Sequence, residues 1–457
     1  LFMKVALILL AIFSAALAAG NPYDLNTHEY FVNPWFENEV DASKTLSQNE
    51  KDAIRTKAAA FWVDTMDVIQ KREPSLKTLL SQASERQKVA TKKVTVTYIH
   101  YDLPNRDCAA KASNGEICCS GNKPDPSTGA CDDASYHSGD CSKGLALYKQ
   151  YTDEVVSVLK QFPNIEIVAI IEPDSLPNLA TNLDSEPHCT QTTKLGYLEG
   201  VKYALKSLSA VSNINMYIDA AHGGWLGWCG THQCGSDNEC GGYKCSKGYC
   251  ECTPYSNNNA QKYVAEIKQI FDEVGSSVTE KVRGFATNVA NYQPLGFPED
   301  SDPCNLKSQY NFAFNEIRYM DVLDRLFKHA GINKSWITDT GRNGNNYVRT
   351  SPHACQQWCN IKGRLGRVPT SQVSDIQSKL ESATLDALAW LKTPGESDGC
   401  SPGSGVTCVR VDSMCQRDCY EGYQKCPAPE AGKWDDDMIK FLMSGWTPNG
   451  EELSLQT

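Results

Sequence analysis

The chain alternates between short, continuous apolar runs and longer segments in which apolar residues recur at helical spacing. A continuous apolar run is typical of a strand buried on both faces, and apolar residues at i, i+3 and i+4 are typical of an amphipathic helix. The predicted strands are residues 60–64, 94–100, 165–171, 214–219, 282–287, 335–338 and 385–391. The predicted helices are residues 45–59, 75–89, 144–162, 190–208, 260–274, 306–329 and 434–443.

This alternation of strands and helices predicts an α/β fold with a parallel sheet and right-handed crossovers. Periodicity alone leaves open whether the strands close into a barrel or form an open sheet. The polar and aromatic segment 21–43 shows neither pattern, so we expect it to wrap the surface. No tandem repeat or low-complexity linker divides the chain, which favours a single catalytic domain over residues 20–457.

The stretch from Ile165 to Asn178 joins the clearest strand to the strongest candidate for chemistry. Its apolar half ends abruptly at Glu172, Pro173 and Asp174, because proline has no N–H to continue a ladder of hydrogen bonds. Two carboxylates therefore lie at the C-terminal end of a core strand. In parallel α/β folds, this end of the sheet is where ligands bind.

Polar side chains also follow the other predicted strands. A single acid at such a position is expected as the N-cap of the next helix. The polar residues that follow different strands, or lie in their exit loops, are Asp64, Asp107, Asp174, Asp219, Asn291, Asp339 and Asp398. So many at the same end of a parallel sheet favour a shared acidic cleft.

Charge and targeting signals narrow the classes of function. The net charge of −11 argues against nucleic acid and against anionic membranes as partners. Lys4, the apolar run 5–17 and the small residues that follow predict a signal peptide over residues 1–19. No later segment predicts a membrane span. Together with an even count of 20 cysteines, these signals predict a secreted, extracellular protein with disulfide bonds.

The cysteines cluster in loops. Six lie between Cys229 and Cys252, in a Gly-rich insertion at residues 229–258 that resembles a small disulfide knot. A zinc site is the competing interpretation, but secreted cysteines normally oxidise and the spacing does not repeat a C-x-x-C pair. We therefore expect no metal and no cofactor.

Asp174 is the candidate proton donor. A carboxyl that leaves a buried strand is partly desolvated, which raises its pKa, and such an acid can protonate a poor alkoxide leaving group. Asp107 could couple to it as a second carboxyl, but a salt bridge to Arg106 or a turn-capping role would also explain Asp107. Asp398 lies in a glycine-flanked turn and, taken alone, would be a surface acid.

The segment from Asp219 to Trp228 concentrates features of a sugar site. Its glycines allow a sugar to approach the backbone closely, and Trp225 and Trp228 offer flat faces to the apolar side of a pyranose ring. The alternative is that both tryptophans cap the core. Asp219 and His222 could also bind a metal, but the pair of helical ligands that such a site needs is missing.

Six motifs occur in a characteristic order. They are YDLPNRDCAA (Tyr101–Ala110), IEPDSL (Ile171–Leu176), YIDAAHGGWLGW (Tyr217–Trp228), ATNVANY (Ala286–Tyr292), DTGRNG (Asp339–Gly344) and KTPGESDG (Lys392–Gly399). Together they resemble glycoside hydrolase family six, the cellobiohydrolases and endoglucanases that cut β-1,4-glucan with inversion. The resemblance runs from about Asn21 to Pro448. It implies a distorted, seven-stranded parallel β/α barrel with long, disulfide-rich loops that roof the cleft.

The resemblance also implies roles for individual residues. Asp174 matches the general acid, Asp107 the acid that tunes it, and Asp398 the candidate base. Tyr101 matches a tyrosine that crowds the reacting ring and favours its distortion. The residues expected to bind the substrate are Asp219, His222, Trp35, Trp225, Trp228, Asn291, Lys392 and Glu396.

Disulfide bonds and one departure follow from the same comparison. Cys108 with Cys189 and Cys359 with Cys415 carry over as pairs by position. Cys355 stands where the family often has a tryptophan, which puts one of the family's sugar platforms in question.

Two long loops predict the mode of action. In the family, exo-acting members roof the cleft with two long loops, and endo-acting members shorten them. Here the loops 110–145 and 392–432 are both long and rich in cysteine, and crosslinks reduce the conformational freedom of a lid. We expect a monomeric, processive cellobiohydrolase that binds cellulose and cello-oligosaccharides and works from the non-reducing end. The alternatives are an endo-acting glucanase of the family, a non-catalytic glucan-binding protein and a metal-dependent hydrolase.

Overall fold

The computed structural model describes residues 20–228, 235–236, 245–246, 249–250, 259–297, 300–309, 311, 313–344, 357–361, 363–403, 405–415 and 427–447. The predicted signal peptide at residues 1–19 lies outside these ranges, as does most of the insertion at 229–258. Both interpretations therefore stay predictions.

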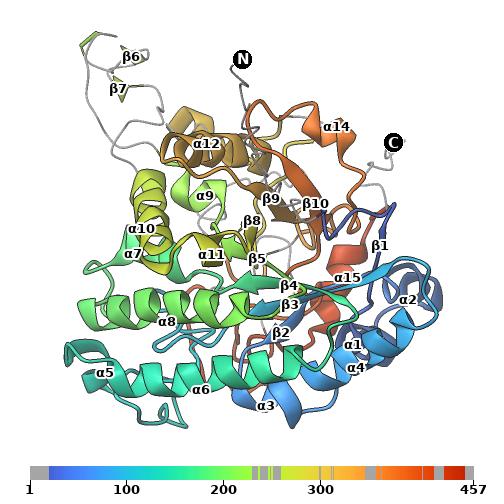
Figure 1. The fold of residues 1–457 in the computed structure, drawn as a ribbon, viewed down its shortest axis with the longest axis horizontal. Helices are drawn as coiled ribbons and strands as arrows, with labels where there is room; N and C mark the ends of the chain where they lie inside the picture. Colours follow the sequence, from blue (N-terminus) through green and yellow to red (C-terminus); the bar gives the residue numbers. More distant parts are fainter. Residues whose placement is uncertain are drawn as a thin grey trace, which may run out of the picture.

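A parallel sheet forms the centre of the fold (Figure 1). Its long strands, in spatial order, are β3 (Lys93–His100), β4 (Glu166–Ile171), β5 (Ile214–Asp219), β8 (Val282–Thr287), β9 (Ser335–Asp339) and β10 (Leu385–Ala389). Two short strands, β1 (His28–Tyr30) and β2 (Phe61–Val63), follow one another along the free edge of β3. They therefore occupy a single further position, and the barrel has seven positions, as predicted.

The sheet curls until its two edges meet. Ala59 forms a parallel bridge with Trp390, which directly follows β10, and the Ala60 N–H donates to the Trp390 carbonyl at 2.8 Å. The contact is narrow, so the barrel is distorted rather than evenly closed. This arrangement confirms the predicted parallel β/α barrel.

The strands are buried on both faces, which explains their continuous apolar runs. One alternate set of strand residues packs together inside the barrel, and it includes Ile99, Val168, Ile170, Tyr217, Ala286, Ile337 and Ala387. The other set joins the surrounding helices in the largest hydrophobic cluster of the described chain. Because side chains alternate along a strand, both sets arise from the same runs.

Helices surround the barrel (Figure 1). Their bounds are α1 Pro34–Ala42, α2 Gln48–Ile54, α3 Met66–Gln70, α4 Leu76–Gln87, α5 Asp133–His137, α6 Ser142–Leu159, α7 Ser175–Asn182, α8 Gln191–Ser209, α9 Gly223–Leu226, α10 Asn259–Val274, α11 Ser276–Thr279, α12 Glu316–His329, α14 Ser374–Gln377 and α15 Asp436–Met443. A two-stranded hairpin, β6 (Cys245–Ser246) and β7 (Tyr249–Cys250), lies in the insertion. In the described ranges, no helix is long and apolar enough to cross a membrane.

The segment 21–43 is not the surface wrap that we predicted. It contains β1 and α1, and Tyr23 is buried with its ring centroid 6.3 Å from that of Tyr217. The Tyr23 and Thr97 hydroxyls lie 3.0 Å apart, within hydrogen-bond distance. A three-residue strand and isolated tyrosines carry no periodic signal, which is why the sequence pattern missed this packing.

Two predicted helices have different limits because polar side chains cap them. The predicted helix 306–329 is a short 3-10 turn, η2 (Leu306–Gln309), followed by α12, where the Asn315 side chain accepts a hydrogen bond from the Arg318 N–H. The predicted helix 45–59 begins at Gln48, after a capping box formed by Ser47 and Glu50.

Five disulfide bonds are described. Cys108–Cys189 and Cys359–Cys415 confirm the two pairings that the family resemblance implies. The others are Cys118–Cys131, Cys119–Cys141 and Cys400–Cys408.

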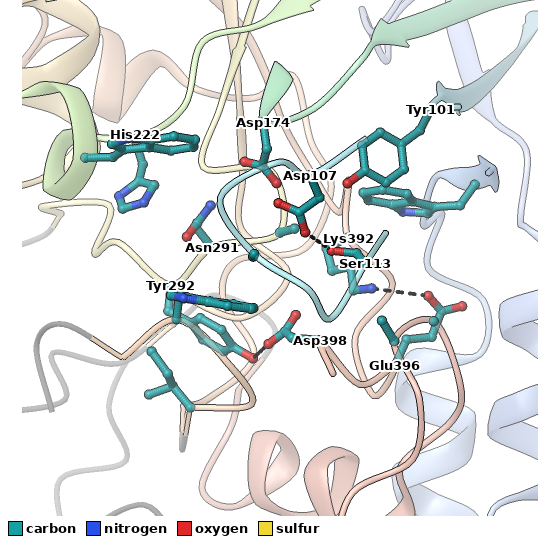
Figure 2. Close-up of a pocket in the computed structure, with 18 of the residues that line it drawn as sticks. Tyr101, Asp107, Ser113, Asp174, His222, Asn291, Tyr292, Lys392, Glu396 and Asp398 are labelled. Carbon is teal, nitrogen blue, oxygen red and sulfur yellow. Dashed lines mark hydrogen bonds and ion pairs between the residues drawn. The ribbon is translucent and has the colours of Figure 1, made fainter. Parts of the chain in front are cut away.

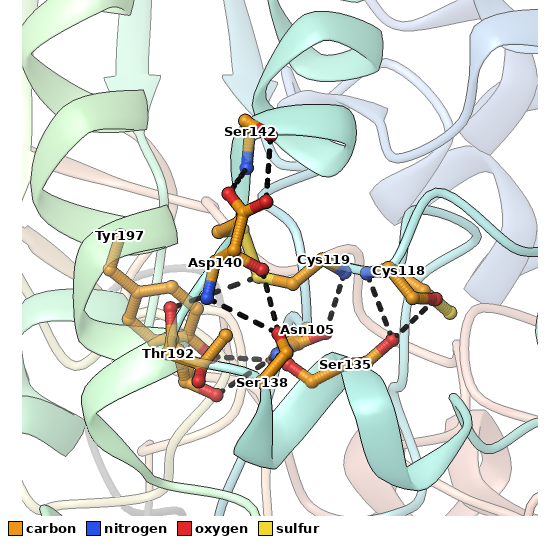
Figure 3. The surroundings of a disulfide bond; sticks show 12 residues. Asn105, Cys118, Cys119, Ser135, Ser138, Asp140, Ser142, Thr192 and Tyr197 are labelled. Carbon is orange, nitrogen blue, oxygen red and sulfur yellow. Dashed lines mark hydrogen bonds between the residues drawn. A yellow bond between two sulfur atoms is a disulfide. The ribbon is translucent and has the colours of Figure 1, made fainter.

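Figure 3 shows the hydrogen bonds around Cys119, which forms the disulfide bond with Cys141. The Asn105 side chain accepts a hydrogen bond from the Cys119 N–H at 3.0 Å and donates to the Ser135 carbonyl at 2.7 Å. The Tyr197 hydroxyl, from α8, donates to the Asn105 carbonyl at 2.9 Å. These bonds fix the backbone just before Asp107.

Candidate active site

A cavity of about 510 Å³ opens at the C-terminal ends of the strands. The predicted site residues that line it are Trp35, Tyr101, Asp107, Asp174, His222, Trp225, Trp228, Asn291, Lys392, Glu396 and Asp398. The remaining predicted residue, Asp219, lies behind Asp174. Figure 2 shows Asp174 and Asp107 directed toward one another, with Asp398 on another wall.

Asp174 is presented by an unusual backbone turn. Glu172 and Asp174 both have left-handed backbone angles, with φ of 48° and 62°. Such conformations are costly for residues other than glycine and persist only where the surrounding structure holds them. Here the Asp174 N–H donates to Asp219 Oδ2 at 3.0 Å, and the Asn178 side chain donates to the Asp174 carbonyl at 2.7 Å.

The surroundings of Asp174 disfavour its charge. Burial raises the pKa of Asp174 well above its ordinary value, and the nearby carboxyls of Asp219, Asp107 and Asp398 raise it further, against the opposing effect of Lys392. Desolvation and like charges both favour the neutral form of a carboxyl. Asp174 therefore keeps a proton that it can donate.

Asp219 is buried behind Asp174 and binds its backbone. It is 1% exposed, and its Oδ2 accepts hydrogen bonds from the N–H groups of Asp174 and Ala221, at 3.0 and 3.3 Å. Its Oδ1 is buried without a hydrogen-bond partner among the described residues. Burial raises the pKa of Asp219 to about 7. Its position indicates that it acts on Asp174 and not directly on a ligand.

Asp107 does not form the salt bridge to Arg106 that we considered. Arg106 instead donates to the carbonyls of Asp64 and Tyr101, each at 2.7 Å. Asp107 accepts a short hydrogen bond from the Ser113 hydroxyl, and burial raises its pKa to about 6 (Figure 2). A carboxyl that is partly protonated near neutral pH can share a proton with its neighbour.

Asp398 is not a surface acid, although its glycine-flanked sequence suggests one. It is 8% exposed, and its Oδ1 accepts from Arg342 at 2.6 Å. Its Oδ2 accepts from the Tyr292 hydroxyl at 2.6 Å and from the Asn360 N–H at 2.8 Å. A fixed carboxyl group thus faces the cavity from the loop after β10.

Glu172, the other acid at the end of β4, does not reach the cavity. It is 1% exposed, and its Oε1 accepts from the Tyr148 hydroxyl at 2.7 Å and from the Asp102 N–H at 3.2 Å. Burial raises the pKa of Glu172 to about 8. This neutral acid joins the ends of β3 and β4 and thereby supports Asp174.

Aromatic rings and polar groups line the rest of the cavity. The Trp225 indole N–H donates to the Thr181 hydroxyl at 2.9 Å, and that of Trp228 to the Gly224 carbonyl at 2.8 Å. These bonds hold both rings at the cavity wall, and Trp225 also packs against the largest hydrophobic cluster. Lys392 and Glu396 form an ion pair at 3.7 Å.

The sequence reasoning missed several residues that line the cavity: Trp62, Arg72, Ser113, Tyr292 and Trp358. Trp62 and Tyr292 lie inside segments that were recognised, the predicted strand 60–64 and the motif ending at Tyr292, and could have been found there. Trp358 begins the segment Trp-Cys-Asn, which the family shares, and could also have been found, whereas Arg72 carries no such signal.

Several of the cavity aromatics have a cation over one ring face. Arg72 lies 3.9 Å from the Trp35 ring centroid, Arg106 4.2 Å from that of Tyr101, and Arg342 4.1 Å from that of Tyr292. In each case one face of the ring is occupied by protein. A ligand can then stack only on the opposite face.

Within the described ranges, no group of three or more His, Cys, Asp or Glu side chains is arranged to hold a metal ion. The candidate chemistry of the cavity rests on the carboxyl groups of Asp174 and Asp107, whose pKa values are raised by burial.

Buried neutral acids make the stability depend on pH. Burial raises the pKa of Glu172 and of Glu316 to about 8. An unfolded glutamate ionises at about 4.3, so between these pH values the unfolded state loses protons that the folded state keeps. The free energy of unfolding then falls as the pH rises, by about 1.4 kcal/mol per group for each unit of pKa difference.

We therefore predict a higher midpoint of urea unfolding at pH 5 than at pH 8. Glu172→Gln should reduce this difference, because glutamine still accepts from the Tyr148 hydroxyl but does not titrate. An equal or higher midpoint at pH 8 would contradict the burial of these acids in neutral form.

Comparison with known proteins assigns the chain to a family. The family model described as glycosyl hydrolases family 6 matches residues 25–124, 130–244 and 254–445. Exoglucanase 3 of Agaricus bisporus is 33% identical over 438 residues, which cover 94% of this chain and 80% of that protein. A 1,4-β-D-glucan cellobiohydrolase of Podospora anserina is 32% identical over 426 residues, covering 92% of this chain and 86% of that protein.

Solved structures agree. Cellobiohydrolase II of Humicola insolens, in complex with glucose and cellotetraose, is similar with a TM-score of 0.71 and 27% identity, covering 94% of this chain and 100% of that one. The catalytic core domain of a Chaetomium thermophilum cellobiohydrolase is similar with a TM-score of 0.71 at 27% identity, covering 94% and 99%. The family match spans most of the chain and includes the segments that carry Asp107, Asp174 and Asp398, and the chain therefore belongs to glycosyl hydrolases family 6.

Proposed function

We propose that this chain is a secreted cellulase that cleaves β-1,4-glucosidic bonds with inversion, as a processive cellobiohydrolase acting from the non-reducing end. The observation that carries this proposal is the carboxyl of Asp174, kept protonated by burial and by neighbouring acids at the wall of a cavity lined with tryptophans. The family assignment, and a relative whose structure holds cellotetraose, support glucan as the substrate.

In the proposed reaction, Asp174 gives its proton to the glycosidic oxygen as the bond from that oxygen to the anomeric carbon breaks. A water adds to the opposite face of the same carbon, so the configuration inverts. Asp107 and Asp219 help Asp174 to hold its proton before the bond breaks. The hydroxyl-bearing ring of Tyr101, fixed under Arg106, crowds the reacting sugar and favours its distortion.

The attacking water must lose a proton. We assign this role to Asp398, which accepts three hydrogen bonds, from Arg342, Tyr292 and the Asn360 backbone. An ionised carboxylate has about four lone-pair sites, so one is left for a proton from water. Its position on a different wall from Asp174 leaves space between them for the sugar and the water (Figure 2).

The rest of the cavity would bind the chain. Trp35, Trp225 and Trp228 can stack on pyranose faces, while His222, Asn291 and the Lys392–Glu396 pair line the same cavity as polar groups that sugar hydroxyls can contact. We therefore expect binding sites for several glucosyl units on both sides of Asp174.

Two loops that line the cavity contact one another, which supports action on chain ends. The Lys111 N–H, in the loop after β3, donates to Asp412 Oδ2 at 2.7 Å, in the loop after β10. Arg410 of the same second loop donates to the Asn114 carbonyl at 3.2 Å. We infer that these two loops enclose the bound chain, so that it is more easily threaded by its end than laid in from the side. An endo-acting glucanase is the alternative.

Secretion is supported by the disulfide bonds, since such bonds persist in oxidising compartments.

Replacing the carboxyl of Asp174 by an amide should strongly reduce turnover. Asp174→Asn should lower kcat on cello-oligosaccharides by about 10²- to 10⁴-fold, the usual contribution of a general acid. The matched control is Asp184→Asn, the same chemical change at an exposed residue just after α7, which should retain activity. Unchanged turnover in folded Asp174→Asn protein would show that the proposed mechanism is wrong and would favour a different acid.

Inversion predicts the configuration of the product. Proton NMR during the first minutes of cellotetraose hydrolysis should show the α-anomer of the newly formed reducing end, before mutarotation. Early formation of the β-anomer would mean retention and would refute the role given to Asp398.

Exo action predicts the course of hydrolysis on a soluble cellulose derivative. Soluble sugar should be released while the viscosity of the solution falls slowly. A rapid loss of viscosity with little soluble sugar would contradict the exo proposal and favour the endoglucanase alternative.

A further inference from the structure

Trp35 is held by two side chains that lie outside the recognised motifs. It belongs to the first turn of α1, is half-buried and lines one part of the cavity. The guanidinium carbon of Arg72 lies 3.9 Å from its ring centroid. Glu39 lies one helical turn further along α1, and the neighbouring Trp35 side chain lowers the pKa of its carboxyl.

We propose that Arg72 and Glu39 are positioning residues that hold Trp35 as a sugar platform with a single available face. This inference rests on the proposed function, because it takes the ligand to be a glucosyl unit of a β-1,4-glucan. It adds to that function the residues that orient Trp35 for stacking on a glucosyl unit.

Arg72 determines which face of the indole is available. A guanidinium is flat and covers an aromatic face well, so a pyranose cannot stack on the same side. Arg72 also lies 6.0 Å from the Phe61 ring, and its Nε is buried without a hydrogen-bond partner among the described residues. Its contact with the rings therefore accounts for its position better than an ion pair does.

Glu39 determines the rotation of the indole. A carboxyl one helical turn along from the indole can accept from its single N–H and so limit the rotation of the ring. Burial, followed by repulsion from Glu396, raises the pKa of Glu39 to about 9, against Lys392 and Arg72, which lower it. As a neutral acid, Glu39 leaves Lys392 free to pair with Glu396.

Binding of cellobiose in the Asp174→Asn background tests this without turnover. Arg72→Ala and Glu39→Ala should each weaken cellobiose binding by about five- to tenfold in calorimetry, because the ring is no longer held in its stacking orientation. Both should also reduce the change in tryptophan fluorescence on titration. Glu39→Gln should restore binding, since its amide oxygen can accept from the indole N–H in the same way as the proposed carboxyl.

The matched control is Arg55→Ala, which removes a half-buried arginine paired with Asp41 and Asp52, does not line the cavity and should bind like the parent. Thermal unfolding of each variant verifies that the protein titrated is folded. Parental affinity in Arg72→Ala and Glu39→Ala would overturn the inference, as would Glu39→Gln binding as weakly as Glu39→Ala. If the parent itself fails to bind cellobiose, the proposed function is wrong, and this outcome is distinct from the others.

Discussion

The crowding of carboxyl groups around Asp174 is the interaction on which the rest of the site depends. Two effects disfavour the ionised form of a carboxyl that is enclosed by protein and surrounded by other acids: the loss of hydration and the repulsion from the neighbouring charges. The parallel barrel makes this possible because the ends of β3, β4, β5 and the loop after β10 converge on one place. Asp107, Asp219 and Asp398 come from three of these ends and share the neighbourhood of Asp174.

Several contacts stabilise these clustered carboxyl groups and offset the repulsion between them. Backbone N–H groups satisfy one oxygen of Asp219, Arg342 neutralises Asp398, and Lys392 opposes the acids near Asp174. Other acids nearby, such as Glu172, are kept neutral beneath the cavity floor. The site therefore combines Asp174, the proposed proton donor, with Asp398, the proposed proton acceptor, whose charge is paired with that of Arg342.

A second feature of the cavity is that a cation lies over one face of several of its aromatic rings. Trp35, Tyr101 and Tyr292 each carry an arginine over one ring face, and Trp62 has the Lys392 ammonium 5.1 Å from its ring centroid. In this way the cations order the rings and also add positive charge to a cavity that is rich in acids. A flat sugar would then meet rings that are already oriented, which lowers the ordering cost of binding.

Much of this could be predicted from sequence because the signals are local. The apolar run 165–171 predicts β4 (Glu166–Ile171) to within one residue, and Pro173 indicates where the strand ends. The seven barrel positions and two disulfide pairs also followed, the latter from family resemblance. Local signals failed where a residue's environment comes from distant segments. Asp398 looks exposed in sequence but is buried by Arg342 and Asn360, and nothing near Arg72 indicates that it covers Trp35.

The central claim is that Asp174 holds its proton in the free protein at a pH where an ordinary aspartate is ionised. Carbon-13 NMR of protein labelled at the aspartate carboxyl carbons, with the Asp174 signal assigned by its loss in Asp174→Asn, measures this directly. The account predicts that the signal titrates well above the ordinary value of about 3.9. A midpoint at or below that value would show that burial and neighbouring acids do not protect the proton, and would contradict the account.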